Sequence, residues 1–380
     1  MPRNRIIYQS EAVYAGPSPA TGAHFQGGAN TNISGDTNLV RQIQRVQTAN
    51  YSFNIDRTDV NQFGQLAAID RVVLTSPTVS LDFNYLFANL ANEELLGFTV
   101  QKTGAGGTVT AEVSCISGIL NKTQDERNYF IKTNAEGSDA VGNTANSVGV
   151  ISIGNGFITS YSQEASVGNF PTASVSVEGL NMKFDTEASG RGLPAINPTD
   201  GKIIADRLFS LPYAERNNNT NNLASGISVL RPGDITFSLP SVIGATSSGN
   251  NQFNIQSYTL SFDLARTPIE KLGSRFAFAR EIDFPLTVNL SLDAQVTDMT
   301  SGNLISLVDN DASTSYNPSI SIKRPGSDDV VARLNLKNAK LDSQEYSSDI
   351  GSNKTVTLNF SSQIGGPEDK NNGLFISGLV

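Results

Sequence analysis

Few residues in this chain are of the types that catalyse reactions or bind metals. The single histidine, His24, lies in a Gly- and Asn-rich N-terminal segment, and Cys115 is the only cysteine. A Ser–His or Cys–His nucleophile pair and a zinc site are therefore excluded or nearly so. The run from Asp309 to Asp311 carries carboxylates, but it lacks the spacing and terminal Glu of an EF-hand, so we interpret it as a turn. We expect no enzyme, no metal and no cofactor.

Composition excludes several other classes of function. The net charge is −9, and phosphate-gripping surfaces need clusters of Lys and Arg, so stable nucleic-acid binding is not expected. The apolar stretches are too short to cross a bilayer, and no signal-peptide core follows Met1–Arg5, so we expect neither a membrane protein nor a secreted precursor. Cys115 has no partner for a disulfide, and we interpret it as a small core residue in a strand over 107–116.

The strongest pattern is an internal repeat. Residues 46–85 recur without a gap 209 positions later as residues 255–294, with 11 identities in 40 aligned positions. Further on the offset drops to 183, where Gly168 and Thr172 align with Gly351 and Thr355. The difference implies 26 extra residues in the first copy, which we place in a loop at 134–147. A period of this length indicates two copies of a whole domain rather than a solenoid repeat.

Four arginines are the only charged residues retained in both copies, namely Arg57, Arg71, Arg266 and Arg280. One interpretation is that each fixes a strand end or turn by bonding to carbonyls or to a carboxylate. A second interpretation is an ion pair across a contact between subunits, and a third is direct contact with nucleic acid. The sequence leaves all three open.

Alternation of apolar and polar residues predicts antiparallel strands with one buried face. The first strands of each copy are expected around 51–56 and 78–85, and around 260–264 and 287–293. Short helices are expected at 89–96 and, more weakly, at 300–307. The fold class is all-β, with one short helix in each of two tandem β-sandwich or barrel domains. The predicted divisions are an N-terminal arm at 1–45, domains at 46–185 and 251–380, and a linker with partial strands at 186–250.

The polar alternates of these strands form the candidate surface of a water-filled channel, because half-polar sheets can close into large barrels. The alternative is an ordinary solvated sheet face. The set contains four Asp and no Lys or Arg, and an acidic wall would repel DNA phosphates. Its members are Ser52, Asn54, Asp56, Thr78, Ser80, Asp82, Asn84, Ser261, Asp263, Thr287, Asn289, Ser291 and Asp293.

The segments 49–64 and 77–83, together with the opening residues 3–11, resemble tail-tube proteins of tailed bacteriophages. The resemblance implies a β-sandwich flanked by a helix that assembles into rings, and rings that stack into a hollow tube for DNA. Most such proteins carry one domain and form hexamers, whereas this chain carries two. It is similar in this respect to tube proteins whose trimeric rings are pseudo-hexameric, so we expect a homotrimer.

The same resemblance implies the partners and the location. The partners would be further copies of the chain and other tail proteins, namely the tape measure, the tail terminator and the baseplate, with DNA only passing through. The location would be the virion tail, assembled in the host cytoplasm. Two alternatives remain: another ring on the same fold, such as a baseplate hub, tail tip or tail-completion protein, or a carbohydrate-binding adhesin module. The absence of Trp disfavours the adhesin.

Overall fold

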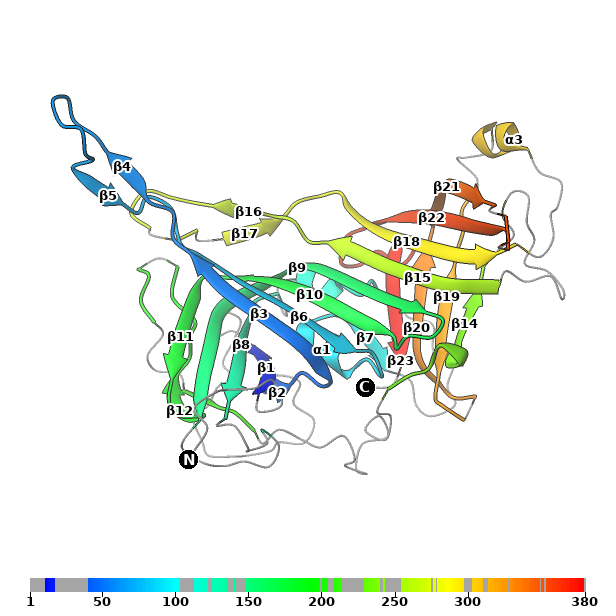
Figure 1. Cartoon of the computed structure of the whole chain (residues 1–380), viewed down its shortest axis with the longest axis horizontal. Coiled ribbons are helices and arrows are strands. Elements are labelled where there is room, and N and C mark those ends of the chain that lie inside the picture. The colour runs from blue at the N-terminus through cyan, green and yellow to red at the C-terminus, as the bar shows by residue number, and fades with distance from the viewer. Residues whose placement is uncertain are drawn as a thin grey trace.

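The computed structural model of the chain is an all-β protein with short helices (Figure 1). The structure describes residues 11–17, 40–102, 113–121, 125–134, 140, 148–198, 200–203, 208–212, 229–239, 242, 254–274, 276–277, 279–296, 303–309, 314–326, 328–348, 350–351 and 353–378.

Eight antiparallel strands form the central sheet. Its first four, in spatial order, are β3 (Val46–Asn54), β6 (Thr78–Leu86), β10 (Thr172–Gly179) and β9 (Gly149–Ser166), which we call the first repeat unit. The other four are β15 (Asn254–Asp263), β18 (Leu286–Gln295), β22 (Thr355–Ile364) and β21 (Lys340–Ser347), the second repeat unit. β9 pairs with β15, and this β9–β15 seam joins the two units into one continuous sheet.

The two repeat units have the same register, residue by residue. Ser52 pairs with Ser80, and their counterparts 209 positions later, Ser261 and Asn289, also pair. The irregularity between Val46 and Thr48 recurs between Ile255 and Ser257. The irregularity in the β10–β9 pair likewise recurs in the β22–β21 pair at the offset of 183. Bulges and alternation together fix which face of a strand is buried, so equal patterns produce equal sheets.

Each hairpin that starts a repeat unit extends beyond the sheet as a narrow ribbon. In the first unit this is β4 (Thr58–Val60) with β5 (Asp70–Val72), and in the second β16 (Arg266–Ile269) with β17 (Ala279–Ile282). Figure 1 shows the β4–β5 ribbon projecting from the body, with β16–β17 closer to the sheet. Gly64 and Gly273 both have a positive φ, 85° and 86°, a turn conformation that glycine adopts more readily than other residues.

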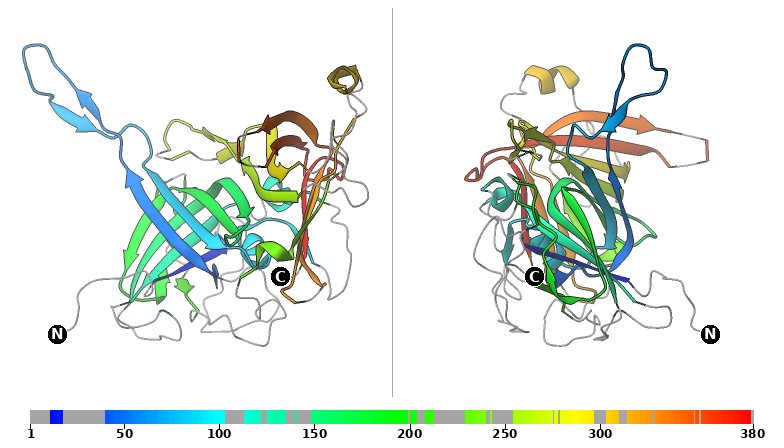
Figure 2. Two further views of the ribbon diagram at one scale, coloured as in Figure 1. Left: turned by 45° about the vertical axis from the view of Figure 1, so that its right-hand side comes forward. Right: turned by 90° about the vertical axis from the view of Figure 1, so that its left-hand side faces the viewer.

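Smaller sheets pack against the apolar face of the central sheet. The N-terminal half of β9 pairs with β8 (Arg127–Thr133) and β11 (Asn181–Asp185), and β8 pairs with β1 (Glu11–Pro17), which carries β2 (Arg41–Gln42). The second group is a five-stranded sheet. Its order is β14 (Ile235–Ser238), β19 (Ser319–Lys323), β20 (Val330–Lys337), β23 (Gly373–Gly378) and β7 (Val100–Lys102). Side chains from both repeat units and these sheets form one continuous hydrophobic core. Figure 2 shows the arrangement of the strands from two further directions.

The remaining elements are short. They are α1 (Ala91–Leu96), α2 (Ser117–Leu120), α3 (Leu304–Asp309), a 3-10 turn at Pro232–Asp234, and the pair β12 (Ser189–Gly192) with β13 (Leu208–Ser210). α1 begins two residues after the predicted start of the helix at residue 89. The side-chain oxygen of Asn89 accepts a hydrogen bond from the Ala91 amide at 3.3 Å. α3 lies four residues beyond the predicted start of its segment.

Some local expectations differ from the structure. The arm predicted at 1–45 contains β1, whose Val13, Tyr14 and Ala15 are buried because β1 pairs with β8 along its whole length. Cys115 is buried as expected, but it lies in a turn before α2 and not in a strand over 107–116. Of that range, residues 107–112 fall outside the described residues. Most of the predicted 134–147 loop also lies outside them, and the division into domains stays a prediction.

Candidate assembly surfaces

The predicted channel residues lie together on the polar face of the central sheet. Twelve of the thirteen belong to β3, β6, β15 and β18, and several are direct cross-strand partners. Ser52 and Ser80 share a hydrogen bond of 2.8 Å, and the Asp293 carboxylate accepts a hydrogen bond of 2.7 Å from Ser257. Asp56 lies beyond the end of β3, where it accepts a hydrogen bond from the Asn54 amide at 2.9 Å.

The polar face is wider than the sequence-based set. One row runs across all eight strands through Thr48, Asn84, Ser174, Ser162, Ser261, Asn289, Ser361 and Lys340. The residues missed from β9, β10, β21 and β22 alternate in the same way as the residues that were identified. Alternation alone could therefore have found them.

Most charges on this face are acidic. Asp82, Glu164, Asp263, Asp293 and Glu345 lie on it, whereas Lys340 stands beyond the irregularity in β21, where it donates a hydrogen bond to the Thr314 carbonyl. Glu178 lies on the same face but is engaged by an arginine of the β16–β17 ribbon. Hydroxyl, amide and carboxylate groups thus form the central part of the surface.

The arginines of the second unit hold the β16–β17 ribbon against the first unit. Arg266 is only 4% exposed and forms an ion pair with Asp125, and its guanidinium carbon lies 4.9 Å from the centre of the Phe157 ring. Arg280 pairs with Glu178 and lies 5.8 Å from the same ring. Both contacts join segments more than a hundred residues apart.

The arginines of the first unit lie on the exposed β4–β5 ribbon. Arg57 is exposed, and Arg71 pairs only locally with Asp59 at 2.7 Å, with 66% of its side chain exposed. The positions that correspond to Phe157 and Glu178 in the second unit are Lys340 and Ser361, which offer no carboxylate. The contacts that Arg266 and Arg280 make with Phe157 and Glu178 are therefore not repeated with the same residue types at the corresponding positions of the second unit. An inter-subunit role for Arg57 and Arg71 stays a prediction.

The two outermost strands of the central sheet, β3 and β21, each pair on one side only among the described strands. β3 corresponds to β15 and β21 corresponds to β9, so each open edge has a counterpart that is already paired in the β9–β15 seam. Tyr51 and Phe53 on β3 correspond to Leu260 and Phe262 on β15. Phe262 is 2% exposed whereas Phe53 is 58% exposed. At the open edge of β3 the apolar face is thus exposed, whereas the corresponding face of β15 is buried at the seam.

A buried carboxylate anchors α1 under the first unit. Glu93 is fully buried and accepts hydrogen bonds from the Tyr85 hydroxyl at 2.6 Å and the Tyr161 hydroxyl at 3.1 Å. Burial raises the pKa of Glu93 from 4.5 to about 7, although the two hydroxyls and Arg45 oppose the shift. Sequence patterning did not identify this residue, because its partners lie on two different strands.

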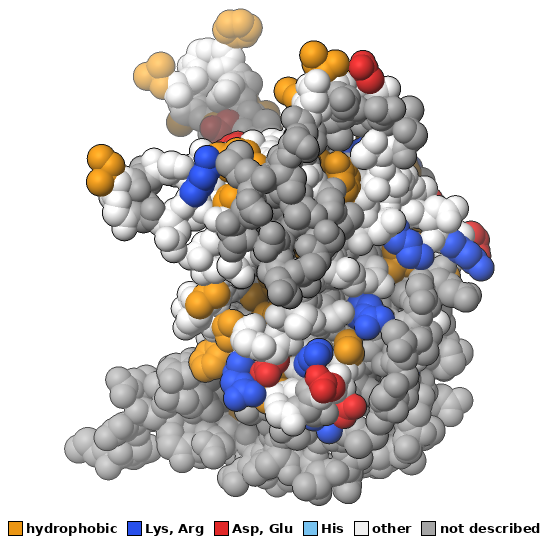
Figure 3. Space-filling model, turned by 90° about the vertical axis from the view of Figure 1, so that its right-hand side faces the viewer, with side chains coloured by type: hydrophobic (Ala, Val, Ile, Leu, Met, Phe, Trp, Pro, Cys, Tyr) orange, Lys and Arg blue, Asp and Glu red, His pale blue; other side chains and the backbone are white. Residues whose placement is uncertain are grey.

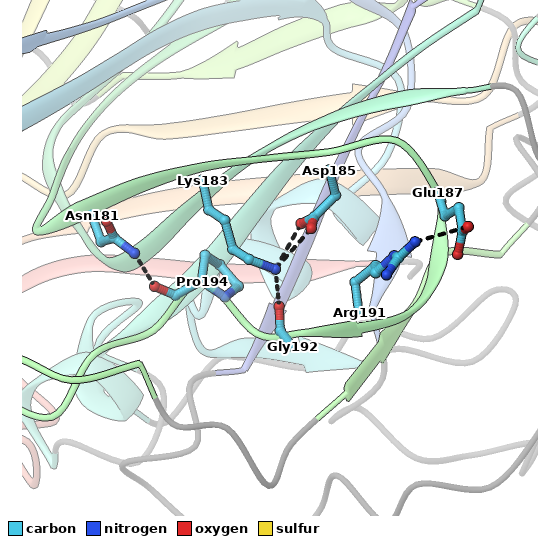
Figure 4. A network of polar contacts seen from close by, with 7 residues as sticks. All are labelled: Asn181, Lys183, Asp185, Glu187, Arg191, Gly192 and Pro194. Carbon is cyan, nitrogen blue, oxygen red and sulfur yellow. Dashed lines mark hydrogen bonds and ion pairs between the residues drawn. The ribbon is translucent and has the colours of Figure 1, made fainter.

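A polar network fixes the segment that follows β11 (Figure 4). The Lys183 ammonium donates to both oxygens of Asp185 and to the Gly192 carbonyl at 2.9 Å each, and the Asn181 amide donates to the Pro194 carbonyl at 2.7 Å. Arg191 and Glu187 form a more exposed pair at 2.8 Å. These contacts hold β11 in place as the outer strand of its sheet, where Phe184 is 65% exposed.

Among the residues that the structure describes, no three His, Cys, Asp or Glu side chains converge in a manner suited to a metal ion. His24 and residues 310–311 fall outside them. No helix of the described chain is long and apolar enough to span a membrane.

Comparison with known proteins gives a limited result. No protein-family model matches the chain, and no curated protein matches it. Among solved structures, a chain from the cryo-EM structure of the anti-feeding prophage (AFP) baseplate, 6-fold symmetrised, is similar over 38% of this chain and 91% of its own length, with 16% identity and a TM-score of 0.24. A likeness with so low a TM-score carries no argument about fold or function. The functional argument rests on the strands of the chain itself.

Proposed function

We propose that this chain is a structural protein of a phage tail that assembles edge to edge into rings, and that stacked rings form the hollow tail tube. The observation that carries the proposal is the β9–β15 seam. Within one chain, the last strand of one repeat unit already pairs with the first strand of the next. The same pairing between chains would join β21 of one copy to β3 of another.

Such pairing is heterologous, so it produces a closed ring if the rotation closes and an open filament if it does not. Three chains, each with eight strands in the central sheet, would form a 24-stranded barrel. With strands about 4.8 Å apart and tilted by about 40°, its wall would be roughly 50 Å across between backbones. That width admits a DNA duplex with solvent around it.

The polar face suits the inner wall of this barrel. The opposite face carries the continuous hydrophobic core and is covered by the outer sheets, so only the polar face is free to line a channel. A surface of Ser, Thr, Asn and carboxylates offers no cationic cluster that would hold phosphates, and its negative charge repels them. DNA could therefore slide past it.

Electron microscopy of the purified protein tests the proposal. We expect closed rings with threefold symmetry and, at higher concentration, hollow tubes of stacked rings. Single rings that never stack would indicate a tail-tip, hub or completion protein on the same fold. A chain that remains monomeric at high concentration would overturn the proposal.

A further inference from the structure

The helix α3 carries unusually exposed apolar side chains. Leu304, Ile305 and Val308 are 66%, 66% and 68% exposed. At the repeat offset, Leu304 and Ile305 correspond to Leu95 and Leu96 of α1, which are 6% and 1% exposed. Figure 3 views this end of the molecule and shows hydrophobic side chains at its top, where α3 lies.

The segment formed by α1 and β7 shows what a helix at this position does within the chain. It starts in the first unit but reaches the second, since Phe98 lies under the seam with its ring centre 5.0 Å from that of Tyr161 and 5.8 Å from that of Phe262. β7 then pairs in parallel with β23, with Val100 opposite Ile376. Phe262 and Ile376 are each 2% exposed as a result.

The first unit has the same two positions, and there they are uncovered. Phe53 corresponds to Phe262 and is 58% exposed. Phe184 on β11 corresponds to Ile376 on β23, because Phe184 pairs with Ile151 and Ile376 pairs with Leu334, 183 positions later. Phe184 is 65% exposed. The chain therefore displays both an apolar helix without a cover and, on the first unit, exposed apolar side chains without a covering helix.

We infer that α3 of one copy docks on the first repeat unit of the next copy, beneath Phe53 and beside β11, as α1 and β7 dock on the second unit within the chain. The inference rests on the proposed ring and names the segment that closes each junction. α1 is tied to its own unit by Glu93, Tyr85 and Tyr161. The corresponding residues of the second unit are Gly302, Ala294 and Gln344, which cannot form this anchor.

A photo-crosslinking experiment identifies the neighbour of each exposed phenylalanine. Benzoylphenylalanine is introduced at Phe53 or at Phe184 in the full chain, and isotopically labelled and unlabelled copies are mixed before assembly. We expect both probes to crosslink to the peptide 304–309 of a differently labelled copy. The same probe at Phe284, which is 59% exposed but lies between β17 and β18, should not reach α3.

Substitutions in α3 provide the second readout. Leu304→Asp with Ile305→Asp should leave the melting temperature of the monomer unchanged, because both side chains are already exposed. Ring formation should need at least a tenfold higher protein concentration. Ile203→Asp, at a residue 44% exposed and remote in sequence from the seam strands, is the control and should assemble normally.

The outcomes separate this inference from the proposed function. Rings that form without any crosslink from Phe53 or Phe184 to α3, or that tolerate both aspartates, would overturn the inference and leave the ring intact. A wild-type chain that forms no rings would overturn both.

Discussion

Ser162 and Ser261 face each other across the β9–β15 seam, and their repeat counterparts, Glu345 and Ser52, occupy the two open edges of the same sheet. In the proposed ring, the β9–β15 seam would be the template for the contact between copies. It would set not only which edges meet but also the register in which they meet, because a slip by one residue would turn the polar face towards the core.

The register predicts a disulfide between copies. In the double variant Ser52→Cys, Glu345→Cys, oxidation should give covalent dimers and trimers on a non-reducing gel, because directly opposed residues of antiparallel strands lie within disulfide reach. Ser162→Cys with Ser261→Cys is the matched control, and its disulfide should form within one chain. Cys115 is fully buried and should not interfere. A first variant that stays monomeric while rings are visible would show that the edges meet in another register.

The arginines predict different effects on stability in the two units. Arg266→Gln should lower the free energy of unfolding by about 3 kcal/mol, because it leaves the nearly buried Asp125 carboxylate without its ion pair. Arg71→Gln should cost less than about 1 kcal/mol, since that pair is exposed to solvent. Urea unfolding of the monomer measures both. Equal losses would contradict the asymmetry between the two ribbons.

Much of the central sheet could be predicted from the sequence, because the repeat and the alternation both report on local backbone geometry. At the offsets of 209 and 183, the cross-strand pairs of the first repeat unit correspond to cross-strand pairs of the second. This includes the pairs next to the irregularities in β3 and β15. Alternation also placed the polar residues of β3, β6, β15 and β18 on one face.

The contacts between distant segments could not be predicted. The burial of Glu93 depends on Tyr85 and Tyr161 from two separate strands, and the parallel pairing of β7 with β23 joins residues more than 270 positions apart. The strand β1 was assigned to an arm because its neighbours are rich in Gly and Asn. Its pairing with β8 overrides that local composition.

Glu93 predicts a pH-dependent stability. The pKa of about 7 in the folded chain exceeds its ordinary value of 4.5, so the folded chain binds more protons than the unfolded chain between these two values. The stabilisation linked to this proton is fully present below about pH 4.5 and is lost as the pH rises through 7. Glu93→Gln keeps an acceptor for the two tyrosines but cannot ionise. Its urea midpoint should change less than that of the wild type between about pH 5 and about pH 8, and an equal change in both would contradict the assignment.

In the proposed tube the acidic polar face would form the inner wall, so reversing its charge should make the tube retain DNA. Asp82→Lys with Asp263→Lys places cations on the polar face at positions that are exposed and whose cross-strand neighbours are polar. Assembled tubes of this variant should bind duplex DNA at low salt at least tenfold more tightly than wild-type tubes, and the binding should weaken as salt rises because counterions are released. Asp328→Lys, at a side chain 98% exposed on the β19–β20 turn, changes charge away from the polar face and should have a smaller effect in a filter-binding assay. If Asp328→Lys increased DNA binding as much as the double variant, net charge and not the position of the wall would explain the result.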